Sequence, residues 1–446
     1  MSSDARRMRV TVVVLGDLGR SPRMLYHARA LGDTVAEVDL LGYVEHPLPA
    51  AVASHPHVRV HRLRAPASGA AARLPRLAFL VYGLWRSARQ AVALFWTLVA
   101  GVARPDVVLV QNPPSVPTLA IALAAARLRG ARLVVDWHNL GAAMLALALG
   151  ARHPVVRAAA WYERVLGRRA DAHLAVSGAL AEFLRARWGI AGAVVLYDRP
   201  GDAFAPTPLA ERHALFARLA PLSDPGEPGG ARDDTLVTYR RADGTLALRP
   251  DRPALVVSPT SWTADEDFGL LFDALGILDA RWRREGDARG TRALVLLTGD
   301  GPLRARSEER IAALGLATVA VRTLWLDPSD YSGLLGAADL GLSLHRSASG
   351  LDLPMKIADL FGAGVPVCAL DYGPVLAEQV RDGETGLLFR DAAALSDRLH
   401  ALLGGFPADT AVLDGLRANV AAHARVRWTE EWLAVARPVF ERCRRP

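Results

Sequence analysis

The stretch DLGLSLHRSASGLDLPMKIADLFGAGVPVCAL, residues 339–370, decides the fold because it reads as a strand, a helix and a second strand in succession. Its two ends, residues 339–345 and 365–370, are short apolar runs, and the helix between them ends at a Gly-Ala-Gly-Val-Pro return. This order is typical of a parallel sheet with helices packed on its faces. Within the helix, Lys356 and Asp359 project from the same face although their flanks are apolar. Charges placed in this way indicate a binding site.

The same alternation of strand-like and helical runs continues in both directions from this stretch. In the second half of the chain, strands are expected at residues 253–261, 292–302, 319–325, 339–345, 365–370 and 386–389. In the first half, they are expected at residues 9–15, 107–110, 132–137, 172–176 and 193–197. Two such series predict an α/β protein with two Rossmann-like, doubly wound domains.

The length of 446 residues also favours two domains, because one hydrophobic core rarely serves so long a chain. We expect residues 1–200 to form the N-terminal domain and residues 251–425 the C-terminal domain. Residues 201–250 are interpreted as a linker or an excursion, since prolines, a Gly-Gly pair and mixed charges gather there. Residues 426–446 are expected to form a C-terminal helix that packs back on the N-terminal domain. The prolines of the linker region are Pro200, Pro206, Pro208, Pro221, Pro225 and Pro228.

The net charge of +7 raises the question of nucleic-acid binding. Arginines are scattered along the expected helices, lysine is almost absent, and no nucleic-acid-binding motif accompanies them, so we expect no nucleic-acid partner. An anionic membrane surface or a diphosphate substrate fits the charge better. The two cysteines, Cys368 and Cys443, imply neither a disulfide framework nor a metal site, and a reducing, cytoplasmic setting is expected.

The sequence shows no signal peptide and no N-terminal membrane anchor. Its most hydrophobic region, residues 74–105, is interrupted by Arg76, Arg86 and Arg89 and is too short in uncharged residues to cross a bilayer. Two interpretations stay open for this region. It is either an amphipathic helix in a membrane interface or a long helix packed on a sheet.

Ligands of open α/β sheets bind beyond the carboxyl ends of the strands, so the loops after each expected strand are the candidate sites. The loop LGDLGRSPRM, residues 15–24, offers Gly16 and Gly19 for close backbone approach and a helix N-terminus for an anion. It suits a phosphate or a sugar, and an ordinary strand-to-helix turn is the alternative. In VVDWHNLG, residues 134–141, His138 follows a strand and is placed to act as a general base, unless its role is structural.

Two loops of the second half add further candidates. In SPTSWTADEDFG, residues 258–269, Thr263 and Glu266 have the spacing of a helix capping box, which leaves Trp262 unexplained. In TGDGP, residues 298–302, two glycines suit a backbone that lies against a nucleotide, or simply a turn.

The opening stretch has the features of a diphosphate site. Pro354 is a suitable first helical residue, and the small residues before it leave amides at a positive helix end. Lys356 would neutralise phosphate charge, and the Asp359 carboxylate can accept two hydrogen bonds from a ribose diol. A surface ion pair between Lys356 and Asp359 is the alternative. No metal-ligand spacing is present, so no cofactor is required, and any Mg²⁺ is expected to arrive with the nucleotide.

With these residues in hand, the chain resembles glycosyltransferases of the GT-B fold, in which two Rossmann-like domains face each other across a cleft. The pattern P-x-K-x-x-[DE] at Pro354, Lys356 and Asp359, with G-x-P at residues 364–366, is similar to the sugar-nucleotide helix of that superfamily. The chain is more similar still to the chitobiosyldiphosphodolichol β-mannosyltransferases. The blocks that carry this resemblance are GDLGRSPRMLYHA, VDWHNLG, SPTSWTADEDF, SLHRSASGLDLPMKIADLFGAGVPVCAL and ETGLLF.

The resemblance implies an inverting β-1,4-mannosyltransferase of lipid-linked oligosaccharide synthesis. It would move mannose from GDP-mannose to the distal GlcNAc of a GlcNAc2-diphosphate-polyprenol at the cytosolic face of a membrane. The N-terminal domain would face the acceptor and the membrane, and the C-terminal domain would bind the sugar nucleotide. His138 is expected to deprotonate or orient the acceptor hydroxyl, with Asp17 as the competing candidate. The implied donor-binding residues are Lys356, Asp359, Gly16, Gly19, Arg20, Gly299, Gly301, Ser349, Gly350, Leu351, Asp352, Trp262 and Thr263.

Two departures from the family pattern leave alternatives open. Eukaryotic members carry an N-terminal anchor, whereas here residues 74–105 and the basic surface would hold a peripheral protein on the membrane. The superfamily's glutamate eight residues before the second acid falls at Leu351, with Asp352 next to it. A GT-B hexosyltransferase with another sugar nucleotide or acceptor, and a non-catalytic subunit of a glycan assembly complex, are the alternatives. Other glycosyltransferases of the pathway are the expected protein partners.

Overall fold

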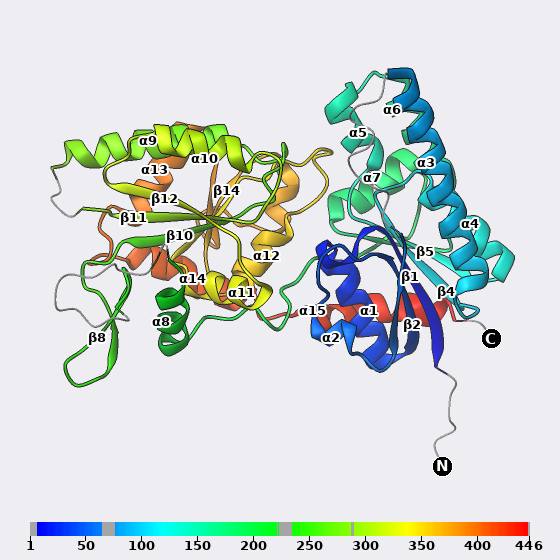
Figure 1. The fold of residues 1–446 in the computed structure, drawn as a ribbon, viewed down its shortest axis with the longest axis horizontal. Helices are drawn as coiled ribbons and strands as arrows, with labels where there is room; N and C mark the ends of the chain where they lie inside the picture. Colours follow the sequence, from blue (N-terminus) through cyan, green and yellow to red (C-terminus); the bar gives the residue numbers. More distant parts are fainter. Residues whose placement is uncertain (1–6, 65–75, 221, 223–233, 287–289, 445–446) are drawn as a thin grey trace, which may run out of the picture. The chain divides into compact units, whose positions relative to one another are not determined.

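The computed structural model describes residues 7–64, 76–220, 222, 234–286 and 290–444. Their contacts divide the chain into two compact units (Figure 1). Unit 1 comprises Met1–Asp198 and Thr429–Pro446, and unit 2 comprises Arg199–Trp428. Each unit is built around its own parallel sheet.

Unit 1 contains a seven-stranded parallel sheet in the order β3-β2-β1-β4-β5-β6-β7. The order reverses between β1 and β4, which makes their carboxyl ends the switch point where doubly wound sheets bind ligands. Runs such as Val12–Val14 and Leu133–Val135 are fully buried, because helices cover both faces of the sheet. The strands are β1 Met8–Asp17, β2 Ala36–Tyr43, β3 Val58–Arg62, β4 Val107–Asn112, β5 Arg132–Trp137, β6 Ala172–Ala175 and β7 Val194–Val195.

Most helices of unit 1 connect successive strands, and the last ones come from the C-terminal segment of the chain. α3 continues into a π-helical turn, Thr97–Gly101, and α4 ends at Gly130, whose φ of 61° is left-handed and favours glycine. The C-terminal segment lies in this unit, where Trp432 and Phe440 are fully buried and stack on each other. The helices are α1 Pro22–Thr34, α2 Ala50–Ala53, α3 Arg76–Trp96, α4 Thr118–Arg129, α5 Gly141–Leu149, α6 Pro154–Gly167, α7 Gly178–Trp188, α15 Trp428–Glu431, the π-helical Trp432–Ala436 and α16 Arg437–Arg442.

Unit 2 contains a six-stranded parallel sheet in the order β12-β11-β10-β13-β14-β15, with a reversal between β10 and β13. One apolar core lies between the sheet and α9 and α13, and a second lies between the sheet and α8, α11 and α12 (Figure 1). The strands are β10 Ala254–Pro259, β11 Ala293–Thr298, β12 Val319–Leu324, β13 Leu340–Ser343, β14 Val367–Leu370 and β15 Gly386–Phe389. The helices are α8 Leu209–Arg218, α9 Phe268–Arg284, α10 Arg304–Ala313, α11 Pro328–Ala337, α12 Met355–Gly362, α13 Ala392–Leu403 and α14 Ala411–His423.

The predicted fold class is confirmed, since both units are doubly wound α/β folds. All six strands expected in the second half are present, as are the five expected in the first half. β2 and β3 were not predicted from the sequence. β2 contains Asp39, and β3 reads VRVHR, so neither presents an uninterrupted apolar run.

Residues 201–250 were interpreted as a linker or an excursion, and the described part of that region is a folded part of unit 2. It holds α8 and the hairpin of β8, Thr238–Arg240, and β9, Leu246–Leu248, and it belongs to unit 2. The side chains of Phe204, Phe216 and Val237 are buried in the second core. Pro208 caps the start of α8, a position that tolerates proline because no helical amide is needed there. Pro221, Pro225 and Pro228 lie outside the described residues.

The hydrophobic region 74–105 is described from Arg76 onward and forms α3 and its π-helical turn; Leu74 and Pro75 lie outside the described residues. Its C-terminal part contacts α4, and Leu94 and Leu98 are buried there. Across the ranges that the structure describes, every helix falls short of the length and apolarity needed to span a bilayer.

Candidate functional site

The carboxyl end of β13 leads through residues 345–353 to α12, which carries the predicted diphosphate residues. Pro354 precedes the first helical residue, Met355, so it is the N-cap rather than the first helical position. Lys356 lies in the first turn and Asp359 one turn later, and both side chains are half-buried. The structure does not show the alternative of an ion pair between them, because the Lys356 ammonium pairs with a different acid.

The Lys356 Nζ atom lies 2.5 Å from Oε1 of Glu266, in the loop after β10. The Glu266 carboxylate is buried, and its second oxygen accepts a hydrogen bond from the Ser261 amide at 2.8 Å. Lys356 is the single lysine among the 53 Lys and Arg residues of the sequence. A chain that otherwise uses arginine for positive charge therefore places its one compact ammonium at the start of α12.

Glu266 was expected to belong to a capping box with Thr263, and that expectation is wrong. α9 begins at Phe268, and its N-cap is Asp267, whose carboxylate accepts the Leu270 amide at 3.0 Å. Thr263 instead hydrogen-bonds Asp265. An acid in a loop after a strand could have marked Glu266 as a candidate site residue. Its spacing from neighbouring residues could not reveal that its partner is Lys356.

His345 ties the loop after β13 to the loop after β10. Its Nε2 lies 3.1 Å from Asp352 and its Nδ1 3.4 Å from Asp265. Burial alone would lower the pKa of His345, but the hydrogen bonds and charges of these two carboxylates outweigh it and raise the pKa to about 9. The hydrogen bond from His345 in turn lowers the pKa of Asp265. An imidazolium between two carboxylates thus clamps the two loops together.

Asp352 shapes the loop in which it lies. Its carboxylate accepts hydrogen bonds from Ser347 and His345, and its backbone carbonyl accepts the Tyr372 hydroxyl at 2.9 Å. These contacts give Asp352 a structural role in the loop, and its predicted role as a donor-binding acid stays a prediction. The neighbouring residues Ser349, Gly350 and Leu351 are half-buried, and the Ser349 hydroxyl accepts the Leu351 amide at 3.1 Å.

The two glycines after β11 are required by the packing of neighbouring loops. A Cβ atom on Gly299 would lie 2.0 Å from the Thr260 carbonyl oxygen, and one on Gly301 would lie 2.0 Å from that of Ser261. Gly299 also has a left-handed φ of 103°. The glycines are therefore explained by loop packing alone, and their predicted contact with a nucleotide stays a prediction.

Trp262 was expected to contact the sugar nucleotide, and the structure corrects this expectation. Its ring is fully buried, stacks on Phe268 with centroids 4.6 Å apart, and donates through Nε1 to the Gly299 carbonyl at 3.0 Å. The residue also has a φ of 52°, which a bulky side chain rarely adopts. Trp262 therefore holds the loops after β10 and β11 together as a core residue.

A hollow of about 430 Å³ lies beside the loop after β10. Its lining includes Glu266, Phe268, Arg306 and Arg310, but Lys356 is not part of it. The hollow therefore does not coincide with the diphosphate site predicted on α12, and we assign no substrate to it.

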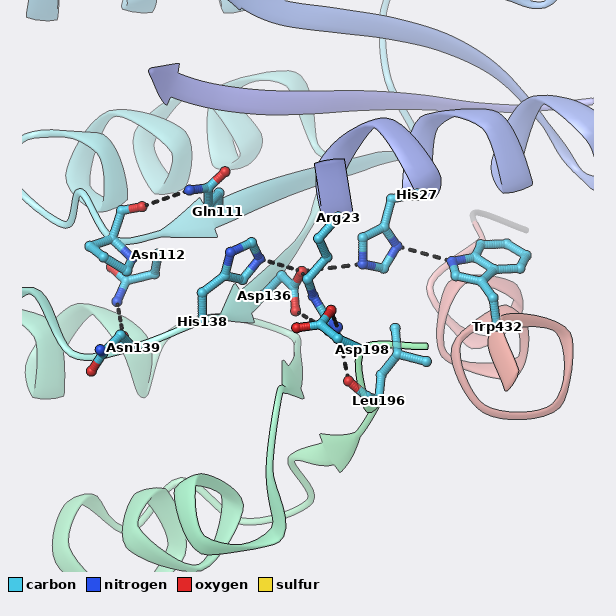
Figure 2. A network of polar contacts seen from close by, with 11 residues as sticks. Arg23, His27, Gln111, Asn112, Asp136, His138, Asn139, Leu196, Asp198 and Trp432 are labelled. Atoms are coloured by element: carbon cyan, nitrogen blue, oxygen red, sulfur yellow. Dashed lines mark hydrogen bonds and ion pairs between the residues drawn. The ribbon is translucent and has the colours of Figure 1, made fainter. Parts of the chain in front are cut away.

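In unit 1, His138 follows β5 and points toward the buried Asp136 (Figure 2). His138 Nε2 lies 2.8 Å from Oδ2 of Asp136, and the imidazole is 22% exposed. Burial would raise the pKa of Asp136, but Arg23 and His138 outweigh burial and lower its pKa well below the usual value. An ionised carboxylate only accepts hydrogen bonds, so His138 carries a proton on Nε2, and its Nδ1 takes no part in this contact.

Asp136 is the centre of a network that sequence reasoning did not predict (Figure 2). Arg23 binds it with two hydrogen bonds, of 2.8 and 2.9 Å, and also binds Asp198 at 2.8 Å. His27 Nε2 lies 3.2 Å from Asp136, and His27 Nδ1 lies 3.0 Å from Nε1 of Trp432. An indole N–H only donates, so it fixes His27 as the tautomer with its proton facing Asp136. Burial lowers the pKa of His27, which agrees with a neutral ring.

Asp17, the competing candidate for the base, has a structural role. Its Oδ1 accepts the Glu45 amide at 2.9 Å, and its Oδ2 lies 2.6 Å from Nδ1 of His46. Burial would raise the pKa of Asp17, but these hydrogen bonds outweigh burial and lower it. These contacts explain Asp17 as a structural residue of the loops, and its predicted role as the competing base stays a prediction.

Of the remaining predicted residues of unit 1, Gly16 lies near the end of β1, and Gly19 and Arg20 follow the strand. A Cβ atom on Gly19 would lie 2.7 Å from that of His46, so packing against the loop after β2 explains this glycine. Gly16 meets only Val14, at an ordinary 3.7 Å, and Arg20 is exposed at the end of a short 3-10 helix, Leu18–Arg20. Their predicted contact with phosphates stays a prediction.

A second buried acid, Glu163 of α6, supports the loops beside this network. It accepts the Gly141 amide at 2.8 Å and the Ala142 amide at 3.0 Å at the start of α5, and hydrogen bonds from Asn112 at 3.1 Å and from Ser115. Negative charge at a helix N-terminus is favourable, so Glu163 anchors the first turn of α5.

Among the residues that the structure describes, no group of three or more His, Cys, Asp or Glu side chains is placed to hold a metal ion. Both cysteines are buried as free thiols.

Comparisons with known proteins identify the class. Residues 18–201 match the family model described as glycosyl transferase 4-like domain, and residues 263–404 match that described as glycosyl transferases group 1. A sucrose-phosphate synthase from Thermosynechococcus elongatus has the same fold, with a TM-score of 0.64 at 17% identity over 98% of both chains. A glycosyltransferase from Rickettsia africae ESF-5 gives a TM-score of 0.64 at 14% identity over 98% of both chains. The chain is a glycosyltransferase of the GT-B fold.

Full-length relatives identify the family. The UDP-glycosyltransferase TURAN of Arabidopsis thaliana is 40% identical over 98% of this chain and 97% of its own. The chitobiosyldiphosphodolichol beta-mannosyltransferase of Mus musculus is 38% identical over 98% of this chain and 89% of its own. The enzyme of the same name from Homo sapiens is 38% identical over 96% of this chain and 92% of its own. The chain belongs to the family of chitobiosyldiphosphodolichol β-mannosyltransferases, as the resemblance predicted.

Proposed function

We propose that this chain is an inverting β-1,4-mannosyltransferase that moves mannose from GDP-mannose to the distal GlcNAc of GlcNAc2-diphosphate-polyprenol. The observation that carries the proposal is the full-length match, at 38% identity, to mannosyltransferases named for this acceptor. The reaction forms a bond between the acceptor oxygen and the anomeric carbon and breaks the bond from that carbon to the diphosphate. The acceptor hydroxyl loses its proton, and GDP leaves with the bonding electrons.

Unit 2 is proposed to bind the donor at α12. The Lys356 ammonium and the amides of the first turn of α12 would neutralise the diphosphate, where charge builds as GDP departs. Asp359, one turn further on, would accept hydrogen bonds from the ribose diol. Glu266 supports this role because its buried carboxylate holds the Lys356 ammonium beside the helix start before substrate arrives.

Unit 1 is proposed to supply the base. The lone pair on Nδ1 of His138 would accept the proton of the acceptor hydroxyl, and the Asp136 carboxylate would stabilise the resulting imidazolium. Arg23 already pairs with Asp136, which keeps a buried carboxylate ionised without leaving its charge uncompensated. Gly16, Gly19 and Arg20 are proposed to approach the phosphates from this unit.

The donor has one competing candidate. The Arabidopsis relative, at 40% identity, is named a UDP-glycosyltransferase, so a UDP-sugar is the second donor to be tested. A Mg²⁺ ion is proposed to enter only with the nucleotide diphosphate. Because the acceptor carries a polyprenol, we place the chain at the cytosolic face of a membrane, beside the other glycosyltransferases of the pathway.

The test is a transfer assay with purified protein and a synthetic GlcNAc2-diphosphate-lipid. GDP-mannose and a panel of UDP-sugars are offered in parallel, and the product is digested with linkage-specific mannosidases. A new β-mannoside formed from GDP-mannose supports the proposal. An α-linked product, or transfer from a UDP-sugar alone, contradicts it, and binding of both substrates without turnover supports the non-catalytic subunit.

A further inference from the structure

Helix α5 is made entirely of apolar residues and glycine, yet it lies on the surface of unit 1. Its first turn is anchored by Glu163, and Ala142 is buried there. The rest of the helix projects its larger side chains into solvent. The exposed fractions are 49% for Met144, 40% for Leu145, 65% for Leu147 and 44% for Leu149.

Helix α3 presents a second exposed apolar stripe. Trp85, Val92 and Trp96, spaced by seven and four residues, share one face and are 56%, 55% and 61% exposed. Arg89 lies on the same face, with its guanidinium 5.2 Å from the centre of the Trp85 ring. Tryptophan beside arginine is the combination that favours the boundary between lipid and water.

The two helices belong to one layer. α5 packs against α6, α6 against α4, and α4 against α3, and α3, α5 and α6 gather at one end of unit 1 (Figure 1). α6 adds Trp161, which is 59% exposed, and Val155, which is 51% exposed. We call this surface the α3–α5–α6 face. It is defined by Trp85, Val92, Trp96, Met144, Leu145, Leu147, Leu149, Val155 and Trp161.

The charge around this face has one sign. Residues 46–162 contain 13 arginines and only two acids, Asp106 and Asp136, and both acids are buried. Arg152 and Arg157 are exposed at the junction of α5 and α6. Apolar side chains with Arg89, Arg152 and Arg157 exposed on the same helices or between them, and no exposed acid on α3, α5 or α6, complement an anionic lipid surface.

We infer that the α3–α5–α6 face inserts into the interfacial region of an anionic lipid bilayer, with α5 as its deepest element. Nine residues are too few to cross a bilayer, so α5 lies in the headgroup boundary. The arginines neutralise the anionic headgroups while the leucines and tryptophans enter the acyl boundary. The inference deepens the proposed function, because it rests on an acceptor carried by a polyprenol, and it moves the main membrane contact from the predicted region 74–105 to α5.

Vesicle flotation of the full chain tests the inference without either substrate. Vesicles of phosphatidylcholine, with and without phosphatidylglycerol, are compared at low and high salt. We expect binding to the anionic vesicles, weakened by salt, and a loss of at least about tenfold in the double variant Leu145→Ser/Leu147→Ser. The matched control is Leu248→Ser/Ile277→Ser, because these residues are 39% and 45% exposed and lie in unit 2.

Three results overturn the inference. The first is vesicle binding by Leu145→Ser/Leu147→Ser equal to that of the wild type, with circular dichroism showing that the variant is folded. The second is an equal loss in the control variant. The third is self-association of the wild type without lipid that the variant abolishes, which would make the face an interface between copies. Transfer to a water-soluble short-chain acceptor is measured separately. Failure of the proposed function removes that transfer in every variant, whereas failure of the membrane inference leaves it intact.

Discussion

The imidazole of His138 donates through Nε2 to Oδ2 of Asp136 over 2.8 Å, and this contact decides which ring nitrogen is available to a substrate. Asp136 is fully buried and ionised, so in the neutral form of His138 the proton lies on Nε2 and the lone pair on Nδ1. The same carboxylate accepts hydrogen bonds from Arg23 and His27. His27 in turn accepts a hydrogen bond from the indole N–H of Trp432, in the C-terminal segment. The orientation of a surface histidine is thus set by a residue 294 positions further along the chain.

Replacement of His138 by alanine should lower kcat by about a hundredfold or more, because a general base contributes on that scale. GDP affinity should be unchanged, since the proposed diphosphate residues lie in unit 2. Steady-state kinetics and calorimetric titration with GDP check the two statements. Full activity in the variant would remove His138 from the mechanism.

Trp432→Phe tests whether the C-terminal segment positions the base. The variant removes the N–H that donates to Nδ1 of His27. This buried nitrogen then lacks a hydrogen-bond partner, and the ring loses its preference for one tautomer. We expect a loss of stability of about 1–3 kcal/mol and a fall in kcat of roughly three- to tenfold, with KM for the donor unchanged. Chemical denaturation and steady-state kinetics measure these quantities.

Trp282→Phe is the matched control for Trp432→Phe. Trp282 is equally buried and donates through Nε1 to His400 at 3.1 Å, but both residues belong to unit 2, whereas His138 belongs to unit 1. This variant should lose stability and keep its kcat. A purely structural role for Trp432 would instead leave kcat the same in both variants.

The close approach of the loops after β10 and β11 predicts a strong glycine requirement. Gly299→Ala and Gly301→Ala each place a methyl group 2.0 Å from a backbone carbonyl oxygen, so each should destabilise the chain by about 3 kcal/mol or more. Gly276→Ala is the control, because its Cβ atom meets nothing within 4 Å in the interior of α9, and it should be neutral or stabilising. Thermal melting that ranks the three variants equally would contradict this account of the loops.

The clamp at His345 predicts a pH dependence. Because the pKa of His345 is raised to about 9 in the folded chain, its stabilising contribution is complete below the ordinary histidine pKa and is lost as the pH rises toward 9. The unfolding free energy should fall by up to about 3 kcal/mol between about pH 6.5 and 9, and this fall should be absent in His345→Gln. Urea unfolding at a series of pH values measures it. A wild-type curve parallel to that of the variant would show that the clamp is not protonated.

Local sequence patterns were sufficient for most of the fold. Uninterrupted apolar runs such as residues 293–298 sit in parallel strands buried on both faces, so they stand out without any tertiary information. β2 and β3 do not stand out in the sequence, because Asp39 interrupts the apolar run of β2 and His and Arg residues interrupt that of β3. The prolines at 200, 206 and 208 suggested a linker, yet proline is equally compatible with a segment that precedes a helix in a packed domain.

The site was predictable only where one segment carries it. Lys356 and Asp359 share a helix face, which spacing reveals, whereas Glu266 reaches Lys356 from 90 residues away. Glu266 looked like a capping residue because its nearest sequence neighbours allow that interpretation. Trp262 shows the opposite error, since a tryptophan in a polar loop suggested a ligand contact and proved to be fully buried. Partners distant in sequence, and the burial of a loop side chain, are set by tertiary packing.

The central claim is that the ammonium of Lys356 at the start of α12 binds the diphosphate of the donor. Removing Lys356 alone would leave the buried Glu266 carboxylate without its cation, so the informative comparison is made in the Glu266→Gln background. Calorimetric titration with GDP should give similar affinities for the wild type and Glu266→Gln, and a Kd raised by about ten- to a hundredfold in Glu266→Gln/Lys356→Ala. An equal Kd in Glu266→Gln and Glu266→Gln/Lys356→Ala would contradict the claim.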